Sequence, residues 1–219
     1  MPVIFDEVFT GLYRLGHITP SEFLQTKPDI SVHAKLLTGG LLPLSTTLAS
    51  ESIFEAFLSS DKSDALLHGH SYTAHAVGCE VARESLRTMM DMEKKGAWSA
   101  FEDDWSGGRV AAGSSSSSRP SAWSMWSKEF VTGLSHRDDV ESVLALGSVL
   151  AISLKDPAGS GYTSTAAIGL RDKLLAGTAG ADQVIHSRVL GNILYLMASI
   201  TSTQETLRGI EKTVTSALR

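Results

Sequence analysis

The chain has 219 residues, and its 24 acidic and 19 basic side chains give a formal net charge of −5. This balance argues against a nucleic-acid-binding protein, because phosphate binding favours a basic face. The composition, 42% apolar and 20% charged, is typical of a globular protein, and no apolar run is long enough to span a membrane. The single cysteine, Cys79, excludes an internal disulfide framework and favours a reducing, intracellular setting.

Short apolar runs alternate with helical or loop segments in the first part of the chain, which favours an α/β sheet. We expect strands at residues 2–5, 30–34 and 44–49. Ser50 is a suitable N-cap for a helix over 51–58. The clearest helical periodicity starts near Thr73 and ends at Gly96, where two lysines and the glycine are typical of a helix C-terminus.

The composition changes after Gly96. Residues 106–122 are rich in glycine and serine and predict a flexible insertion rather than a packed element. Beyond it we expect a helix at 123–134, a strand at 143–154, a helix at 163–176, strands at 184–188 and 193–197, and a C-terminal helix through Leu207 and Leu218. The sequence therefore predicts part of an α/β layer at 1–95 and a smaller α+β domain at 96–219.

Two polar features follow the first two predicted strands. Asp6 and Glu7 stand at a strand's carboxyl end, the edge at which open α/β sheets bind ligands, although a solvated turn is the commoner meaning of such a position. Lys35 stands between the second strand and Gly39-Gly40. If these apolar surroundings remove it from solvent, its amine is suited to attack a carbonyl; a surface lysine with an apolar stem gives the same pattern.

The segment His68-Gly69-His70-Ser71-Tyr72-Thr73 comes just before the strongest predicted helix. Glycine and hydroxyl groups at a helix start can bind a phosphate, because backbone N–H groups and the helix dipole favour an anion there. Together with His75, the histidines also suggest a metal site. Few carboxylates and no cysteine accompany them, so we predict no metal.

Arg188 and Tyr195 interrupt an otherwise apolar hairpin with a Gly191-Asn192 turn. The arginine can bind a carboxylate through two parallel hydrogen bonds, and a structural salt bridge is the equally frequent alternative. A carboxylate, a lysine, an anion cradle and an arginine form the set that pyridoxal phosphate requires. The carboxylate holds the ring nitrogen protonated, the lysine bonds to the aldehyde, and the cradle binds the phosphate.

Three segments resemble the motifs of the class-III, fold-type I aminotransferases. Residues 5–16 resemble their aspartate motif, 28–40 their lysine motif and 68–72 their phosphate motif. Residues 37–48 and 188–197 are similar to the diaminopelargonate aminotransferases of biotin biosynthesis, most of all to the eukaryotic form fused to dethiobiotin synthetase.

The resemblance implies the second part of a pyridoxal-phosphate-binding large domain, with a mixed, mainly parallel sheet, followed by a small C-terminal α+β domain. It also implies a homodimer, with 7-keto-8-aminopelargonate as substrate and S-adenosylmethionine as amino donor. The implied roles are Asp6 at the pyridine nitrogen, Lys35 at the cofactor aldehyde and in proton transfer, His70 and Ser71 at the phosphate of a neighbouring subunit, and Gly69, Arg188 and Tyr195 at the substrate.

Members of this family have a long segment before the aspartate motif, so we expect a truncated chain that is weak or inactive without a partner. Two alternatives remain open. One is a non-catalytic module that docks on a full-length subunit, and the other is a different class-III enzyme, such as an ω-amino acid aminotransferase or a racemase. The fused relatives are mitochondrial, so we expect an intracellular protein of the mitochondrion, with the cytosol as the alternative.

Overall fold

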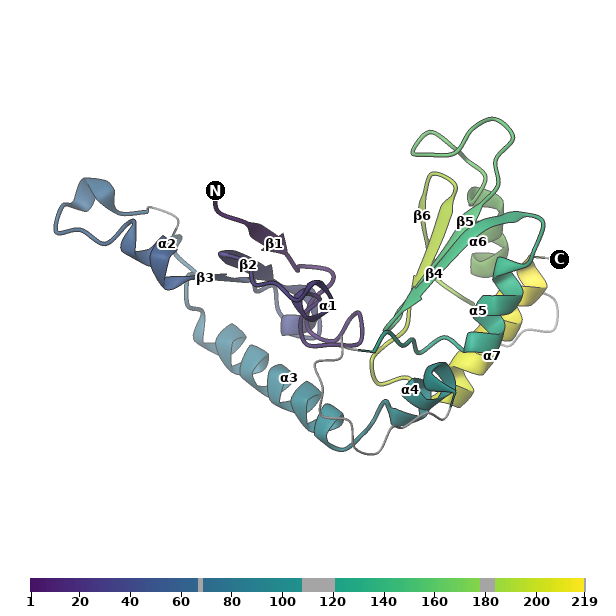
Figure 1. Ribbon diagram of the computed structural model, residues 1–219, viewed down its shortest axis with the longest axis horizontal. Coiled ribbons are helices and arrows are strands. Elements are labelled where there is room, and N and C mark those ends of the chain that lie inside the picture. Colours follow the sequence, from purple (N-terminus) through teal and green to yellow (C-terminus); the bar gives the residue numbers. More distant parts are fainter. Residues whose placement is uncertain (67–68, 108–120, 178–183, 219) are drawn as a thin grey trace. The chain divides into compact units, whose positions relative to one another are not determined.

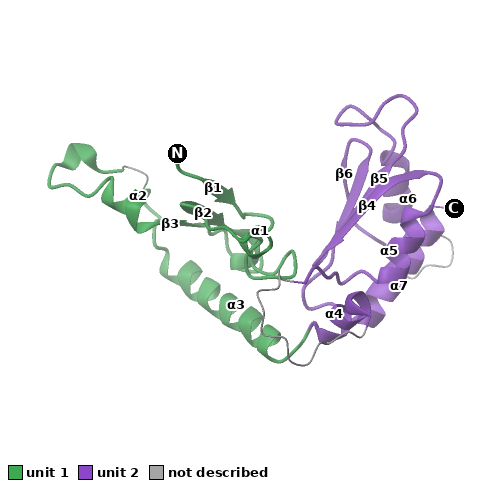
Figure 2. Ribbon diagram, viewed as in Figure 1, with its two compact units in different colours: residues 1–97, 117–120 green, residues 98–116, 121–219 purple. Residues whose placement is uncertain are grey.

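The computed structural model describes residues 1–66, 69–107, 121–177 and 184–218. These residues form two compact units, shown in different colours in Figure 2. Unit 1 contains residues 1–97, and unit 2 begins at Trp98. Each unit has a sheet of its own.

The sheet of unit 1 contains β1 (Ile4–Asp6), β2 (Ile30–His33) and β3 (Thr46–Ala49), in that order (Figure 1). β1 and β2 are parallel, whereas β2 and β3 are antiparallel. The three predicted strands are therefore confirmed and the sheet is mixed, but over these strands it is not mainly parallel. The short 3-10 helix η1 (Lys35–Leu37) follows β2 almost directly.

The helices of unit 1 are α1 (Ser21–Leu24), α2 (Glu51–Glu55), the 3-10 helix η2 (Lys62–Asp64) and α3 (Ala76–Lys94). The long helix begins later than predicted, because His75 rather than Thr73 caps it: the His75 Nδ1 accepts the Gly78 N–H at 3.0 Å. Ser50 precedes α2 as predicted, but its side chain makes no capping hydrogen bond. The Ser85 hydroxyl donates to the Leu36 carbonyl at 2.9 Å, which ties α3 to η1.

Five described non-glycine residues have a left-handed backbone, and all of them lie in unit 1: Leu12, Tyr13, Gln25, Lys35 and Ala74. Leu12 and Tyr13 are buried, and their N–H groups donate to Ile18 and His17 carbonyls at 2.8 and 2.9 Å. This conformation costs about 1–2 kcal/mol for a residue with a Cβ, so it persists only where the surroundings enforce it.

Unit 2 has a wholly antiparallel sheet of β4 (Val140–Leu146), β5 (Val149–Leu154), β7 (Ile193–Met197) and β6 (Arg188–Leu190), in that spatial order. The predicted single strand at 143–154 is wrong, because Gly147 has a φ of 53° and turns the chain into a hairpin. The predicted strand at 184–188 is wrong except for its last residue, because β6 begins at Arg188 and runs to Leu190.

The helices of unit 2 are α4 (Ser99–Ser106), α5 (Lys128–Ser135), α6 (Ile168–Ala176) and α7 (Gln204–Ala217). α4 has no counterpart among the predicted elements, and α5 begins five residues later than its predicted start. The prediction for residues 106–122 falls mostly outside the described residues. The core lies between the sheet and the helices, where Leu150, Ile152, Leu174, Leu194 and Val214 are fully buried.

Candidate active site

Asp6 is the last residue of β1 and lies opposite Val32 of the parallel strand β2. Its exposed carboxylate accepts the Val8 N–H at 3.1 Å, which fixes the turn that leaves the strand. The predicted acid at a strand's carboxyl end is therefore present. Its neighbour Glu7, in contrast, is buried and only 3% exposed.

Glu7 and His33 form a buried polar pair that the sequence analysis missed. Glu7 Oε1 accepts the Thr19 hydroxyl at 2.6 Å, and Glu7 Oε2 lies 3.6 Å from His33 Nδ1. His33 Nε2 is 3.1 Å from the Ser31 hydroxyl. The sequence does contain a signal for this pair. If the first two predicted strands are parallel and Asp6 lies beside Val32, then Glu7 lies beside His33 at the end of β2.

Lys35 begins η1 with a left-handed φ of 52° and an exposed side chain. The expectation that its surroundings remove it from solvent is therefore wrong for this structure. Its ammonium lies 6.0 Å from the centre of the Phe9 ring, and the guanidinium carbon of Arg14 lies 5.7 Å from the same ring. Burial lowers the pKa of Arg14 from its ordinary value. Two cations thus lie within cation–π range of one aromatic ring.

The predicted phosphate segment is exposed and bonded within its own turn. The His70 N–H donates to the Thr73 hydroxyl at 2.8 Å, and the Tyr72 N–H donates to His70 Nδ1 at 3.1 Å. Gly69 and Ser71 are exposed, whereas His68 lies outside the described residues. Among the described residues, no hydrogen bond or ion pair joins His70 or Ser71 to Asp6 or Lys35.

Arg188 and Tyr195 are directly opposite each other in the β6–β7 hairpin. Directly opposite residues of an antiparallel pair share a face, and the buried Leu194 and Leu196 occupy the other, core-facing side. The exposed guanidinium of Arg188 makes no ion pair with any residue in the described ranges. Among the described residues, Arg188 therefore takes part in no structural salt bridge.

A side-chain amide fixes the turn of this hairpin. Asn192 is 3% exposed, and its Nδ2 donates to Glu141 at 3.1 Å, to the Ser153 hydroxyl at 2.9 Å and to the Leu154 carbonyl at 2.9 Å. At the neighbouring Gly191, a Cβ would lie 1.9 Å from the Gly161 carbonyl oxygen, so only glycine fits. The Arg188–Tyr195 hairpin therefore ends in a rigid turn.

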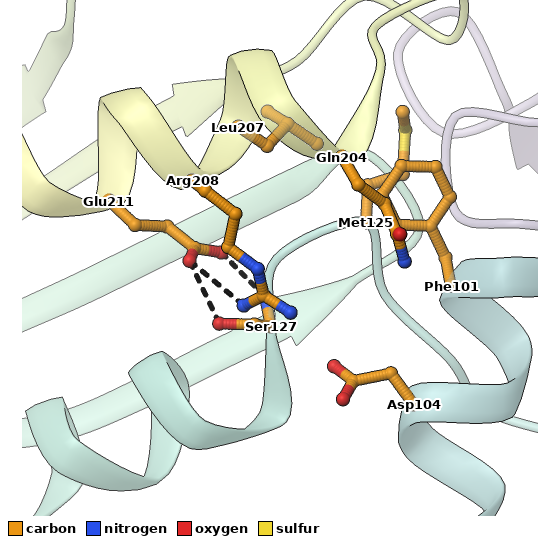
Figure 3. Close-up of a pocket in the computed structure, with 8 residues that line it drawn as sticks. All are labelled: Phe101, Asp104, Met125, Ser127, Gln204, Leu207, Arg208 and Glu211. Atoms are coloured by element: carbon orange, nitrogen blue, oxygen red, sulfur yellow. Dashed lines mark hydrogen bonds and ion pairs between the residues drawn. The ribbon is translucent and has the colours of Figure 1, made fainter.

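A second buried carboxylate stabilises unit 2 (Figure 3). Glu211 of α7 accepts the backbone N–H of Ser127 at 2.6 Å and its hydroxyl at 2.8 Å, and it pairs with Arg208 at 3.1 Å. Ser127 is the N-cap of α5. Because every carboxylate contact is made to a helix end or its own helix, we assign this cluster to stability rather than to catalysis.

The site residues thus fall into three groups. Asp6 and Lys35 belong to unit 1, His70 and Ser71 to an exposed turn of that unit, and Arg188 with Tyr195 to unit 2. Within the described ranges, no cluster of histidine, cysteine or acidic residues suited to a metal ion occurs. No described helix is both long and apolar enough to cross a membrane.

Residues 1–100 match the family described as Aminotransferase class-III. A bifunctional dethiobiotin synthetase/adenosylmethionine-8-amino-7-oxononanoate aminotransferase of Emericella nidulans is 59% identical over 100% of this chain and 27% of that protein. The mitochondrial bifunctional dethiobiotin synthetase/7,8-diamino-pelargonic acid aminotransferase of Oryza sativa subsp. japonica is 41% identical over 94% of this chain and 22% of its own length. The chain therefore spans about a quarter of the length of these curated relatives.

Solved structures agree with the predicted fold. An adenosylmethionine-8-amino-7-oxononanoate aminotransferase from Methanocaldococcus jannaschii matches with a TM-score of 0.73 at 25% identity, over 98% of this chain and 45% of that one. An amine transaminase of an uncultivated Pseudomonas species, in its PLP-bound form, matches with a TM-score of 0.71 at 21% identity, over 99% and 44%. The predicted fold class, that of the fold-type I aminotransferases, is confirmed.

Proposed function

Since residues 1–100 belong to the class-III aminotransferase family, we propose that this chain carries the lysine and the aspartate of a pyridoxal-phosphate-dependent aminotransferase. The reaction is the transfer of an amino group from S-adenosylmethionine to 7-keto-8-aminopelargonate in biotin biosynthesis. The fungal and plant relatives named for this activity support it. Unit 1 is then part of the cofactor-binding domain, and unit 2 is the small C-terminal domain.

One observation carries the proposal: Asp6 ends β1 and Lys35 follows the end of β2, two paired parallel strands inside the matched residues. The side chains fit the cofactor, because an exposed carboxylate can pair with a protonated ring nitrogen and an exposed amine can bond to an aldehyde. When bound, the cofactor supplies an electron sink for the carbon that exchanges its amino group. Lys35 Nζ is the group that holds and moves the proton, and Asp6 keeps the ring nitrogen charged.

The test is an absorbance scan of the chain with added pyridoxal phosphate, followed by borohydride reduction and peptide mapping. A visible band that reduction removes, with the label on Lys35, is the expected result. Labelling scattered over exposed lysines such as Lys27, Lys62 and Lys95 would contradict the proposal, because it would show that no lysine is selected.

Replacing Asp6 by asparagine is expected to weaken retention of the cofactor without unfolding unit 1. The asparagine side-chain oxygen can still accept the Val8 N–H, but the charge that pairs with the ring nitrogen is lost. Charge-assisted hydrogen bonds contribute about 1.5–3 kcal/mol, so the dissociation constant should rise by about ten- to a hundredfold. Equilibrium dialysis measures it, and Asp29→Asn, in the same unit, is the control.

Arg188→Lys is expected to weaken binding of 7-keto-8-aminopelargonate. We infer that Arg188 binds the substrate carboxylate and that Tyr195 lines the same face, as their opposed positions in the hairpin suggest. Lysine keeps the positive charge but lacks the planar fork that pairs with both carboxylate oxygens, so a loss of about tenfold is expected. Calorimetry measures it, with Arg171→Lys, half-buried in the same unit and paired with Asp172, as the control. If Arg188→Lys and the unaltered chain bind the substrate equally well, Arg188 does not bind the substrate carboxylate.

We also propose that the chain works as a dimer, with His70 and Ser71 binding the phosphate held by the neighbouring subunit and Gly69 beside the substrate. The exposure of this turn, and of the large apolar side chains Leu48, Phe54, Leu58 and Leu66 in the same unit, supports an association through unit 1. Sedimentation should give twice the mass of 23.4 kDa. A monomer at micromolar concentration would contradict it.

The location that we propose is the mitochondrion. The relatives from Oryza sativa and Arabidopsis thaliana carry that word in their names. Cell fractionation with an antibody against the chain tests it, and recovery in the cytosolic fraction alone would contradict it.

A further inference from the structure

A buried carboxylate and a buried imidazole face each other beside the strand ends that carry Asp6 and Lys35. The side chains of Glu7 and His33 are 3% and 12% exposed, and their facing atoms, Oε2 and Nδ1, are 3.6 Å apart. Neither atom has a hydrogen-bond partner among the described residues. Buried polar atoms are costly when they have no partner. These two atoms are within ion-pair distance of each other, so their attraction offsets part of that cost and holds both side chains in place.

The pair fastens β1 to β2 on the face opposite Asp6. Asp6 is in register with Val32, and the Glu7 N–H donates to the Val32 carbonyl at 3.0 Å. Because side chains alternate along a strand, Glu7 and His33 lie on one face and Asp6 on the other. The contact therefore fixes the two strand ends without occupying the space on the Asp6 side.

The rest of the pair's surroundings is polar and closely packed. Thr19 donates to the second oxygen of Glu7, and Ser31 lies within hydrogen-bond distance of the second nitrogen of His33. At Gly11, a Cβ would lie 3.0 Å from His33 Nδ1 and 2.9 Å from the Glu7 carbonyl oxygen, so the backbone of Gly11 covers the pair closely. Both side chains are thus held at each end.

We propose that Glu7 and His33 are positioning residues that set the separation of the Asp6 carboxylate and the Lys35 amine. Lys35 stands two residues after His33 in a left-handed conformation, which persists only while the chain on either side is held. Loss of the pair lets the end of β2 relax, and Lys35 moves with it. This inference rests on the proposed function, since it concerns the same two residues.

Two amide substitutions separate the contacts of His33. The side-chain nitrogen of asparagine takes about the place of Nδ1, which faces Glu7, whereas that of glutamine takes about the place of Nε2, which faces Ser31. His33→Asn therefore keeps a side-chain nitrogen that faces Glu7, whereas His33→Gln does not. Glu7→Gln keeps the size and an acceptor for Thr19 but removes the charge. His17→Gln is the matched control, because it breaks another histidine–glutamate contact of unit 1, at 3.5 Å from Glu22.

The experiment measures the affinity for added pyridoxal phosphate, the fraction reduced onto Lys35, and the thermal unfolding of the chain without cofactor. Glu7→Gln and His33→Gln are expected to lower the affinity by about tenfold, which corresponds to about 1.4 kcal/mol. His33→Asn should stay within about threefold of the unaltered chain, and His17→Gln should match it. Circular dichroism at the assay temperature shows that each variant is folded.

Equal affinities of His33→Asn and His33→Gln would overturn the inference, and so would an equal loss in His17→Gln. Lower thermal stability with unchanged affinity and labelling would reduce the pair to a structural contact and overturn it too. If the unaltered chain forms no adduct at Lys35, the proposed function fails and the inference fails with it. If the unaltered chain reacts and all the variants react equally, only the inference fails.

Discussion

Replacing Lys35 by alanine is expected to abolish covalent capture of pyridoxal phosphate while the chain stays folded. The amine is the group that bonds to the aldehyde and moves the proton, so its loss removes a nucleophile and a general base together. General acid–base catalysis alone contributes about 10²–10⁴-fold, so any transamination should fall by at least that factor. The adduct found by mass spectrometry after reduction should be lost.

The same substitution should leave stability almost unchanged, which makes the result interpretable. The Lys35 side chain is exposed, and exposed substitutions usually change stability by less than about 0.5 kcal/mol. Alanine keeps the Cβ, so the cost of the left-handed backbone at this position also stays. Lys27→Ala, at another exposed lysine of unit 1, should react like the unaltered chain. A full visible band in Lys35→Ala would show that another lysine holds the cofactor.

Glu211→Ala is expected to destabilise unit 2 by about 3 kcal/mol, because it removes a buried charge that accepts three hydrogen bonds and leaves donors of Ser127 without a partner. Glu211 is 5% exposed and Ser127 is 4% exposed, so water replaces the lost acceptor poorly. The change also weakens the N-terminus of α5, which Ser127 caps.

Urea unfolding followed by tryptophan fluorescence measures this change in unit 2 selectively. All four tryptophans of the chain, at positions 98, 105, 123 and 126, belong to that unit. Glu205→Ala, on the exposed side of the same helix, is the matched control and should cost less than about 0.5 kcal/mol. Unfolding curves that coincide for the two variants would show that the buried carboxylate contributes nothing.

The sequence predicts the strand ends of unit 1 well, because its signals are local. An apolar run that ends in Asp6, and another that ends before Lys35, mark strand ends whatever packs around them. The Glu7–His33 pair escaped prediction for the opposite reason. Its two residues lie on either side of α1 in the chain, and only the parallel register of β1 and β2 brings them together.

The errors in unit 2 arise where tertiary packing outweighs periodicity. Residues 143–154 are mostly apolar, and Gly147 marks the tight turn between two strands. The predicted helix includes Trp123 and Trp126, yet both side chains are buried in the segment before Ser127, which caps the helix. The cap at Ser127 was readable from the sequence, since serine is a favoured N-cap. Its link to Glu211 was not readable, because that residue lies 84 positions away.

The left-handed residues of unit 1 also determine where this protein can be made more robust. Glycine adopts such a backbone without the steric cost that a Cβ brings, but its flexibility in the unfolded chain offsets part of that gain. Leu12 and Tyr13 are buried and Lys35 carries the amine, so glycine there would remove packing or function. Gln25 and Ala74 are exposed, and there glycine removes only strain. An engineer seeking heat tolerance in this unit therefore has these two positions to change, whereas at the other three the strain comes with buried packing or with the amine.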